Sequence, residues 1–467
     1  MNRPSFRQIR IFFAGFFFFL TLLCLLSGSE RMARMMFYQP GPLFVRMAST
    51  FTVAGMLLVL WLLGTAFFFG RYFCAAVCPL GILQDVIGSV GKSSKARVPN
   101  IKKLRYGVAI FSFLLLWGGW AVGFQFFDPF SRFVSITSAA LAVFSGSLLR
   151  EPTFTAFALL FSGLLPFILL AVLVFWKKRI YCTVLCPVGT VLGLCAKYGF
   201  FRMGINDACD GCQLCEHSCP TSCIDSQARK IDNERCVRCM NCISCCPRNA
   251  LTFSRQSIGG SNTNLSFSAA RRAFLVRGFS FSAGALLAGH VLSGPIRALV
   301  HYGKRLRGIL LPPGAIDTER FARACTSCQL CVINCPQRII KPSTYVFGPV
   351  HLDYTHAGCQ YDCVHCASIC PSGALQNLTL EDKQWLKIGE AVFDASKCRI
   401  VKDGTPCGLC ASACPKEAIL FFNETSSGLG IPEVAVFHCI GCGACQAACP
   451  QSPKAIYVEG IEQEMMM

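Results

Sequence analysis

The sequence predicts a multi-domain protein: an α-helical membrane bundle of four spans, a small cysteine-rich α+β domain, a fifth apolar helix and a second cysteine-rich domain. Three observations predict this. Hydrophobic residues make up 53% of the 467 residues and charged residues only 15%, which is more apolar than a soluble protein. Cysteine occurs 32 times, mostly in tight runs. Residues 1–307 carry 33 Lys and Arg against 10 Asp and Glu, whereas residues 308–467 carry 11 against 15.

Four apolar segments are long enough to cross a bilayer as helices, and they lie at residues 10–27, 51–70, 106–127 and 154–175. The N-terminus, the connection after the second segment and the end of the fourth are rich in Lys and Arg. Because cytoplasmic loops of membrane proteins carry this excess, we expect both ends of the four-span domain, residues 1–200, in the cytoplasm. A shorter Ser-rich stretch at 133–149 is expected to be an outer-face or re-entrant helix.

Two cysteine runs follow in a compact domain at residues 201–255. Each has the spacing C-x-x-C-x-x-C-x-x-x-C-P, which is typical of bacterial ferredoxins with two [4Fe–4S] clusters. The cysteines are Cys209, Cys212, Cys215 and Cys219 in the first run and Cys236, Cys239, Cys242 and Cys246 in the second. In this pattern the fourth cysteine reaches the other cluster, so Cys219 and Cys246 are expected to exchange partners. A disulfide scaffold or a zinc site would not need this arrangement.

Residues 256–307 are predicted to be a linker and an anchor helix. The stretch "AARRAFLVRGFSFSAGALLAGHVLSG" at 269–294 has paired arginines before a modest apolar segment, as in a twin-arginine export signal. This route carries folded domains, which suits clusters inserted in the cytoplasm. The alternative is an ordinary anchor helix with basic flanks, and the basic residues after 294 argue against export.

Residues 308–467 contain four more runs, each ending in Cys-Pro, and are expected to form a four-cluster polyferredoxin domain. Two have the standard spacing and two have a longer first gap. The runs are Cys325, Cys328, Cys331, Cys335; Cys359, Cys363, Cys366, Cys370; Cys398, Cys407, Cys410, Cys414; and Cys439, Cys442, Cys445, Cys449. Six quartets therefore predict six [4Fe–4S] clusters. Cys24, Cys195, Cys223 and Cys245 fall outside the quartets and are expected to be buried or spare thiols.

A repeated element lies at the ends of two apolar segments. "RYFCAAVCPLG" at 71–81 returns 108 positions later as "RIYCTVLCPVG" at 179–189. Cysteines four apart project from one face of a helical turn, and the prolines then stop the helix. The four cysteines, Cys74, Cys78, Cys182 and Cys186, are predicted to bind a seventh iron–sulfur centre at the inner face. The alternatives are a disulfide or two structural thiol pairs.

Several cofactors are excluded or unsupported. Residues 1–216 contain no histidine, which excludes a bis-histidine haem in the bundle, and no C-x-x-C-H motif occurs for a c-type haem. No dinucleotide or P-loop motif follows a plausible strand. The basic residues lie beside apolar segments, so no nucleic-acid partner is expected. Asp128 and Glu151 are the acids between the third and fourth spans, and they are either proton acceptors for a quinol or ordinary surface and capping groups.

With these motifs in place, the chain resembles known families. Residues 1–255 resemble the membrane polyferredoxin of periplasmic nitrate reductase systems, the NapH type, and related membrane proteins that serve nitrous oxide reductase. Residues 269–467 resemble the exported four-cluster partner, the NapG type. The chain departs from both types because it fuses the two into one polypeptide. The resemblance implies a membrane protein that passes electrons from the quinol pool to a periplasmic reductase or cytochrome acceptor.

The expected function is therefore electron transfer, as the iron–sulfur subunit of a quinol dehydrogenase complex in a bacterial inner membrane. Residues 201–255 are expected in the cytoplasm and residues 308–467 in the periplasm. Two other functions need the same clusters. One is a redox maturation or sensing factor for an exported reductase, and the other is a subunit of an ion-translocating redox complex.

Overall fold

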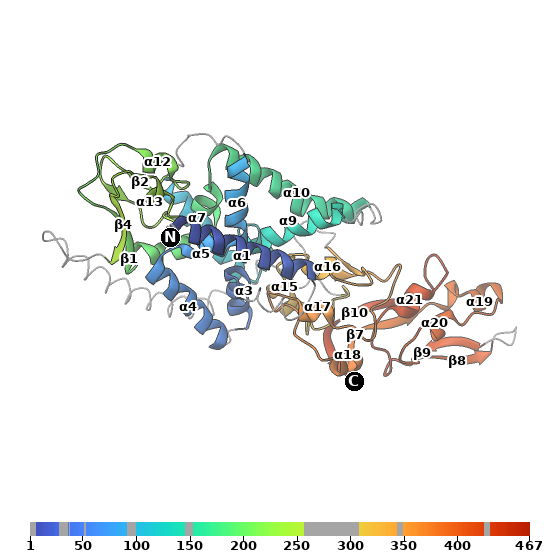
Figure 1. Ribbon diagram of the computed structural model, residues 1–467. Helices are drawn as coiled ribbons and strands as arrows, with labels where there is room; N and C mark the ends of the chain where they lie inside the picture. Colours follow the sequence, from blue (N-terminus) through green and yellow to red (C-terminus); the bar gives the residue numbers. More distant parts are fainter. Residues whose placement is uncertain are drawn as a thin grey trace. The chain divides into compact units, whose positions relative to one another are not determined.

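The computed structural model describes residues 6–27, 36, 38–50, 53–90, 100–144, 153–255, 308–342, 349–424 and 430–467 (Figure 1). The chain divides into two compact units. The first comprises residues 1–27, 38–136 and 162–300, and the second comprises residues 28–37, 137–161 and 301–467. The predicted linker and anchor helix, with the paired arginines, lie outside the described residues, as does Glu151.

Apolar helices form the N-terminal part of the chain. They are α1 (Phe6–Ser27), α3 (Pro40–Thr50), α4 (Val53–Phe69) and α10 (Thr153–Trp176). Among the residues that the structure describes, one helix, over Phe6–Leu26, is both long and apolar enough to cross a membrane, and Val53–Phe69 and Phe161–Trp176 are shorter apolar helices. Large apolar side chains on these helices point outward, and Phe12 and Phe19 are 72% and 74% exposed.

The predicted span over residues 106–127 is not one helix, and that expectation is wrong. Helix α7 (Lys102–Trp117) ends at a turn where Gly119 has φ +83°, and the short helix α8 (Ala121–Gln125) follows. The chain then runs back along α7, since the rings of Phe113 and Phe124 lie 5.9 Å apart and those of Phe111 and Phe127 lie 6.3 Å apart. Glycine reaches this positive φ without steric cost, and composition alone does not distinguish such a hairpin from a span.

Helix α9 (Pro129–Phe144) overlaps the Ser-rich stretch for which a short helix was predicted.

Two helical breaks carry the repeated cysteine element. The short helix α5 (Tyr72–Ala76) is followed by α6 (Pro79–Val90), and the π-helical turn η2 (Tyr181–Leu185) is followed by α11 (Pro187–Lys197). The first helix of each pair ends just before the second cysteine, whose N–H still donates to a carbonyl five residues earlier, that of Phe73 or Tyr181. Each proline opens the next helix, where its missing N–H leaves no hydrogen bond unmade.

The domain at 201–255 is a small α+β fold. Strand β1 (Phe201–Ile205) pairs antiparallel with β4 (Leu251–Arg255), in the register Phe201 to Arg255 and Ile205 to Leu251. Between them lie α12 (Leu214–Ser218), β2 (Ile224–Asp225), β3 (Lys230–Ile231) and α13 (Asn241–Cys245). The core consists of Met203, Ile224, Leu251 and several of the cysteines.

The described residues of the C-terminal domain form short helices and three antiparallel strand pairs. The helices are α15 (Thr318–Ala324), α16 (Leu330–Ile333), α17 (His365–Ser368), α18 (Leu380–Trp385), η4 (Ala395–Lys397), α19 (Arg399–Asp403), α20 (Leu409–Ser412) and α21 (Ala444–Ala448). The pairs are β5 (Ile340–Lys341) with β6 (His351–Leu352), β7 (Leu386–Phe393) with β10 (Ile456–Met466), and β8 (Ile419–Glu424) with β9 (Gly430–Val434). Cysteines again contribute to a shared core.

Candidate iron–sulfur centres

The four standard cysteine runs share one backbone conformation. In each, the second and fourth residues after the first cysteine have positive φ. These residues are Gly211 and Gln213, Arg238 and Met240, Ser327 and Gln329, and Gly441 and Gly443. Left-handed residues at alternate positions are typical of a nest, in which successive backbone N–H groups point toward an anion such as an iron–sulfur cluster. Five of these eight residues are not glycine, and left-handed backbone at such residues is strain that accumulates at functional sites.

The end of each run is also repeated. In five of the six runs the third residue after the last cysteine has positive φ, and its N–H donates to the carbonyl of that cysteine at 3.0–3.4 Å. These residues are Ser222, Asn249, Arg338, Gly373 and Glu417. The two runs with a longer first gap share this turn. The backbone after the fourth cysteine therefore has the same conformation in all runs but the last.

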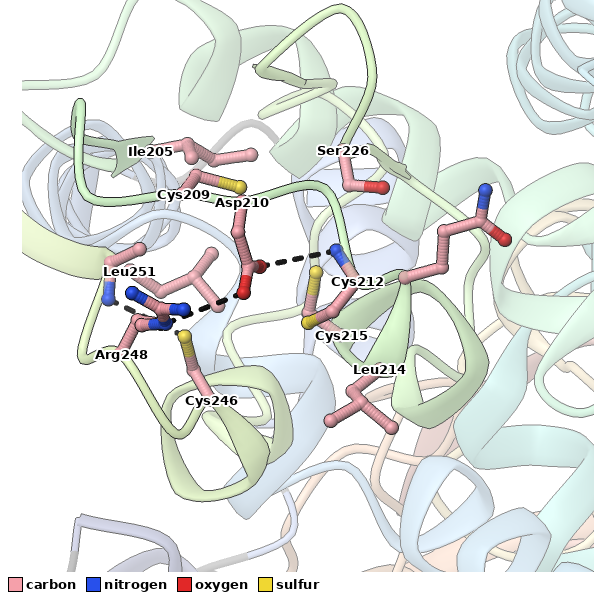
Figure 2. A pocket seen from close by; sticks show the side chains of 12 residues that line it. Ile205, Cys209, Asp210, Cys212, Leu214, Cys215, Ser226, Cys246, Arg248 and Leu251 are labelled. Carbon is pink, nitrogen blue, oxygen red and sulfur yellow. Dashed lines mark hydrogen bonds and ion pairs between the residues drawn. The ribbon is translucent and has the colours of Figure 1, made fainter.

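The first cavity of the 201–255 domain brings four thiols together. Cys209, Cys212 and Cys215 line it with Cys246 from the other run, around about 340 Å³ of space that is partly open to solvent (Figure 2). Asp210 accepts a hydrogen bond of 3.2 Å from the N–H of Cys212, and Arg248 lies 3.3 Å from its carboxylate. This ion pair joins the two runs beside the cavity.

The second cavity contains the complementary set. Cys219 joins Cys236, Cys239 and Cys242 around about 350 Å³, so the structure places the exchanged cysteines where the spacing predicts them. A fifth thiol, Cys223, lines the same cavity. Its Sγ atom lies 3.5 Å from the Sγ atom of Cys219.

The runs of the C-terminal domain are paired by the same exchange. Burial, followed by the nearby charges of Cys328, Cys325 and Cys370, raises the pKa of Cys331 well above its usual value. Burial, followed by Cys359, Cys335 and Cys363, does the same to the pKa of Cys366. Cys370 therefore lies near the thiols of the first of these runs and Cys335 near those of the second, as the same exchange predicts.

A third cavity lies at the last run. Cys439, Cys442 and Cys445 line it with Cys414 from the preceding run, around about 350 Å³. Cys410 lies near Cys407 and Cys398, and burial first and then these thiols raise its pKa to about 11. Cys449 is buried in the same core.

One buried tyrosine joins the two halves of the C-terminal domain. Tyr354 is 1% exposed, and its hydroxyl donates to the carbonyl of Gly441 at 3.1 Å. Burial, followed by Cys359 and Cys442 from different quartets, raises its pKa well above the usual value. The N–H of Cys359 donates directly to the carbonyl of Cys442 at 2.7 Å. The quartets around these two cysteines are therefore neighbours.

The repeated membrane element assembles four more thiols. Cys74, Cys78, Cys182 and Cys186 are each about 5–6% exposed. Burial, followed by Cys182, Cys74 and Cys78, raises the pKa of Cys186 well above its usual value. All four thiols predicted to share a centre therefore lie close together.

Two arginines hold this thiol set by reciprocal hydrogen bonds. Arg71 of the first repeat donates to the carbonyl of Cys182 at 2.6 Å, and Arg179 of the second donates to the carbonyl of Cys74 at 3.0 Å. Both guanidinium groups are buried. The arginine at the start of each repeat thus binds the first cysteine of the other repeat.

The glycine that ends each repeat lies against the backbone carbonyl of the first cysteine in its own repeat. A Cβ atom on Gly81 would lie 2.5 Å from the carbonyl oxygen of Cys74, and one on Gly189 would lie 2.9 Å from that of Cys182 and 2.5 Å from Arg71. Glycine is therefore required for the helix after each proline to pack against the carbonyl that the arginine binds.

Further polar groups surround the thiols. Gln84 donates to Sγ of Cys182 at 3.1 Å, and the N–H of Gly189 donates to Sγ of Cys186 at 3.1 Å. Burial opposes ionisation of Asp85, but the guanidinium groups of Arg179 and Arg10 outweigh it and hold its pKa below the usual range. This carboxylate fixes Arg179 through bonds of 2.7 and 2.6 Å.

These residues fit an anionic iron–sulfur centre. Burying a guanidinium is costly unless its donors are paired, yet Nε of Arg71 has no hydrogen-bond partner in the structure. Cubane clusters with four thiolates are negatively charged and accept hydrogen bonds at sulfur, so four thiols beside two buried arginines suit such a group. Among the described residues, no three His, Cys, Asp or Glu side chains form a site for a single metal ion.

The thiol set of the repeats lies next to the second cavity of the 201–255 domain. Arg238, between Cys236 and Cys239, is buried, and a Cβ atom on Gly70 would lie 2.5 Å from its Nε atom. Burial raises the pKa of Cys239 to about 12, and Arg179 opposes this effect. Arg179, which hydrogen-bonds to the carbonyl of Cys74, is thus near enough to act electrostatically on Cys239.

Glu234 connects the 201–255 domain to the first repeat and to helix α7. Its backbone carbonyl accepts from Arg71 at 3.3 Å, and its carboxylate accepts from Arg105 and Tyr106 of α7. Sequence reasoning did not single out these arginines or Glu234. The signal for Arg71 and Arg179 was present, because both begin the repeat, but no pattern pointed to Glu234.

Comparisons with known proteins agree with this arrangement. A 4Fe-4S binding domain matches residues 51–97, 159–206 and 364–387, which include both repeated elements. A second 4Fe-4S binding domain matches residues 206–222, 233–249 and 323–344, and a 4Fe-4S dicluster domain matches residues 405–452. No solved structure matches the chain.

Three relatives show how far the similarity extends. An uncharacterized protein of Methanocaldococcus jannaschii is 30% identical over 194 residues, which is 40% of this chain and 66% of that protein. Ferredoxin-type protein NapG of Escherichia coli K12 is 34% identical over 192 residues, 37% of this chain and 78% of NapG. The methylamine utilization ferredoxin-type protein MauM of Methylobacillus flagellatus is 34% identical over 160 residues, 32% of this chain and 68% of MauM. The chain is an iron–sulfur electron-transfer protein and belongs to the family of ferredoxin-type proteins that includes NapG.

Proposed function

We propose that this protein takes electrons from the quinol pool of a bacterial inner membrane and passes them to a reductase or cytochrome outside the cytoplasm. It would act as the iron–sulfur subunit of a quinol dehydrogenase complex, with six [4Fe–4S] clusters in the ferredoxin quartets and a seventh centre at Cys74, Cys78, Cys182 and Cys186. The observation that carries the proposal is Arg71, which donates hydrogen bonds both to the carbonyl of Cys182 in the repeat and to that of Glu234, two residues before Cys236 of the second ferredoxin cavity. It joins an apolar helical bundle to a cluster relay.

Exposed apolar helix faces support a membrane location. Large apolar side chains are exposed on α1, α4 and α10, among them Trp61 and Leu169, and large exposed apolar patches are rare on soluble monomers. We retain four crossings, with the third within residues 106–144, where the chain reverses at Gly118 and Gly119 before α9. The number of crossings stays even, so both repeats remain on the cytoplasmic side.

Oxidation of a quinol releases two electrons and two protons, whereas each cluster accepts one electron. The electrons would enter the repeat centre and reduce two clusters, and the protons need an acceptor. Asp128 is the candidate, since it is fully buried and its Oδ1 atom has no hydrogen-bond partner in the structure. It follows Phe127, whose carbonyl accepts from the hydroxyl of Tyr181, the neighbour of Cys182.

The C-terminal domain would carry the electrons on the outer side. Its four quartets are linked in pairs by exchanged cysteines, and the pairs meet at Tyr354. The similarity to NapG supports delivery of electrons to an exported redox partner. The name of MauM, by contrast, associates that relative with methylamine utilization. A helix within 256–307 would connect the two sides.

The test is quinol-dependent reduction of the protein in liposomes. Protein reconstituted anaerobically with a menaquinol analogue should develop the EPR signals of reduced clusters, and Cys74→Ser should slow this at least tenfold while dithionite still reduces the ferredoxin clusters. If the wild-type protein stays oxidised with quinol but accepts electrons from a cytoplasmic donor, the quinol role is wrong. The maturation or sensing function would then be the better explanation.

A further inference from the structure

The second ferredoxin cavity has one thiol more than a cluster needs. Cys223 is 6% exposed and lines the cavity with Cys219, Cys236, Cys239 and Cys242. Its Sγ atom lies 3.5 Å from that of Cys219. Five sulfur atoms therefore share one site.

The position of Cys223 is fixed by the turn that ends the run. Ser222 has φ +48° and donates to the carbonyl of Cys219 at 3.3 Å, which brings the next residue back to the Cys219 thiol. Ala250 has the same place in the first cavity, four residues after Cys246, and its N–H donates to Sγ of Cys246 at 3.3 Å. The two backbones are equivalent, and only the side chain differs.

Other runs show that this place does not require a thiol. The residue four positions after the last cysteine is Ala250, Ile339, Ala374, Ala418 or Pro453 in the other five. An alanine fills the equivalent place beside the first cavity and is 2% exposed. Packing alone therefore does not account for a cysteine at 223.

We propose that Cys223 is a fifth thiol of the second ferredoxin cluster and serves as its reserve ligand. In the intact cluster its S–H group donates a hydrogen bond to the Cys219 sulfur, which stabilises the added negative charge of the reduced state and raises the reduction potential. When Cys219 is lost from the iron, Cys223 releases its proton to solvent and binds the same iron as a thiolate. The cluster then keeps four cysteine ligands and four irons. This inference rests on the assignment of the cavity to a [4Fe–4S] cluster.

The experiment compares the two cavities in the full-length protein. Cys219→Ala should retain the iron content of the wild type, because Cys223 replaces the lost ligand. The matched variant Cys246→Ala has no reserve thiol and should lose iron from the first cluster, with a [3Fe–4S] EPR signal or the loss of one [4Fe–4S] component. The double variant Cys219→Ala/Cys223→Ala should behave like Cys246→Ala, and adding Ala250→Cys to Cys246→Ala should restore the lost iron.

A second readout reports on the intact cluster. Cys223→Ala should keep all the iron and shift one [4Fe–4S] component to lower potential in an EPR-monitored redox titration. Cys223→Ser keeps a hydrogen-bond donor and should recover part of this shift. Equal iron loss in Cys219→Ala and Cys246→Ala would show that Cys223 is not a reserve ligand. Full iron content in Cys246→Ala would show that one thiol can be lost without a reserve ligand, and it would overturn the inference while leaving the proposed function intact. A wild-type protein that lacks the iron of these two clusters would overturn the proposed function itself. EPR of the C-terminal clusters shows that each variant has folded.

Discussion

Arg71 donates a hydrogen bond of 2.6 Å to the backbone carbonyl of Cys182, 111 residues away in the sequence. Arg179 returns the same contact to Cys74 at 3.0 Å. The two repeats are thus related as halves of one site, and each half completes the other. Because the arginines are buried, they also supply positive charge beside four thiols.

Removing one of these arginines should open the thiol site. Arg71→Met keeps most of the side-chain volume but leaves the carbonyls of Cys182 and Glu234 without a donor, which costs about 1–3 kcal/mol for each buried group. We expect the iron of the repeat centre to be lost and the thermal stability to fall. Iron analysis and thermal unfolding test this, with Lys103→Met at the exposed start of α7 as the control. Unchanged iron and stability would contradict the reciprocal arrangement.

The glycines of the repeats provide a second test. Gly189→Ala places a Cβ atom 2.5 Å from Arg71 and 2.9 Å from the Cys182 carbonyl, so it should displace the arginine and remove the repeat centre. Gly107→Ala in α7 meets nothing within 4 Å and should be neutral, or stabilising by about 0.5–1 kcal/mol. EPR of both variants reports on the repeat centre, and their melting temperatures report on stability. If the two glycines tolerate alanine equally, the close approach is not required.

The repeat cysteines should bind one centre jointly. Cys74→Ser and Cys182→Ser, made separately, should each remove the same EPR or Mössbauer component and leave the six ferredoxin clusters, about 24 iron atoms, in place. Cys195→Ser is the control, since this cysteine belongs to no quartet. Variants that keep full iron and full quinol-dependent reduction would show that the repeat is structural.

Tyr354 should control electron flow between the halves of the C-terminal domain. Tyr354→Phe loses only the hydrogen bond to Gly441, whereas Tyr354→Ala leaves a cavity that costs about 3–5 kcal/mol and separates neighbouring quartets. We expect little change in the first variant and weaker magnetic coupling with slower intramolecular transfer in the second. Pulsed EPR and flash reduction measure these two quantities. Equal rates of intramolecular electron transfer in the wild type and both variants would show that Tyr354 does not affect transfer between the quartets.

The compartment of the C-terminal domain can be tested directly. A reporter fused after Met467 that is active only outside the cytoplasm should be active, because the charge balance changes sign near residue 307 and paired arginines precede an apolar stretch. Replacing Arg271 and Arg272 by Lys should abolish this activity. A reporter after Arg255 should work only inside the cell. The opposite pattern would place the C-terminal domain in the cytoplasm.

The sequence by itself determined the chemistry of this protein, because cluster ligation is local in the chain. The spacing of Cys209, Cys212 and Cys215 specifies a loop that wraps one cluster, and the exchange of Cys219 and Cys246 follows from the same rule. Composition also identified the apolar segments. These features depend on neighbours within a few residues and so can be read along the chain.

Only the tertiary structure decided which distant groups meet. Residues 106–127 are apolar enough for a span, yet the turn at Gly119 sends the chain back along α7, and hydropathy does not report direction. Cys223 was expected to be a buried or spare thiol, because three of the four thiols around it come from the following run. Nothing in the local sequence pointed to Glu234, which binds Arg71 and Arg105 from separate segments. Such contacts form because burying a charge or a thiol requires a partner, and the fold, not the local sequence, determines which partner is within reach.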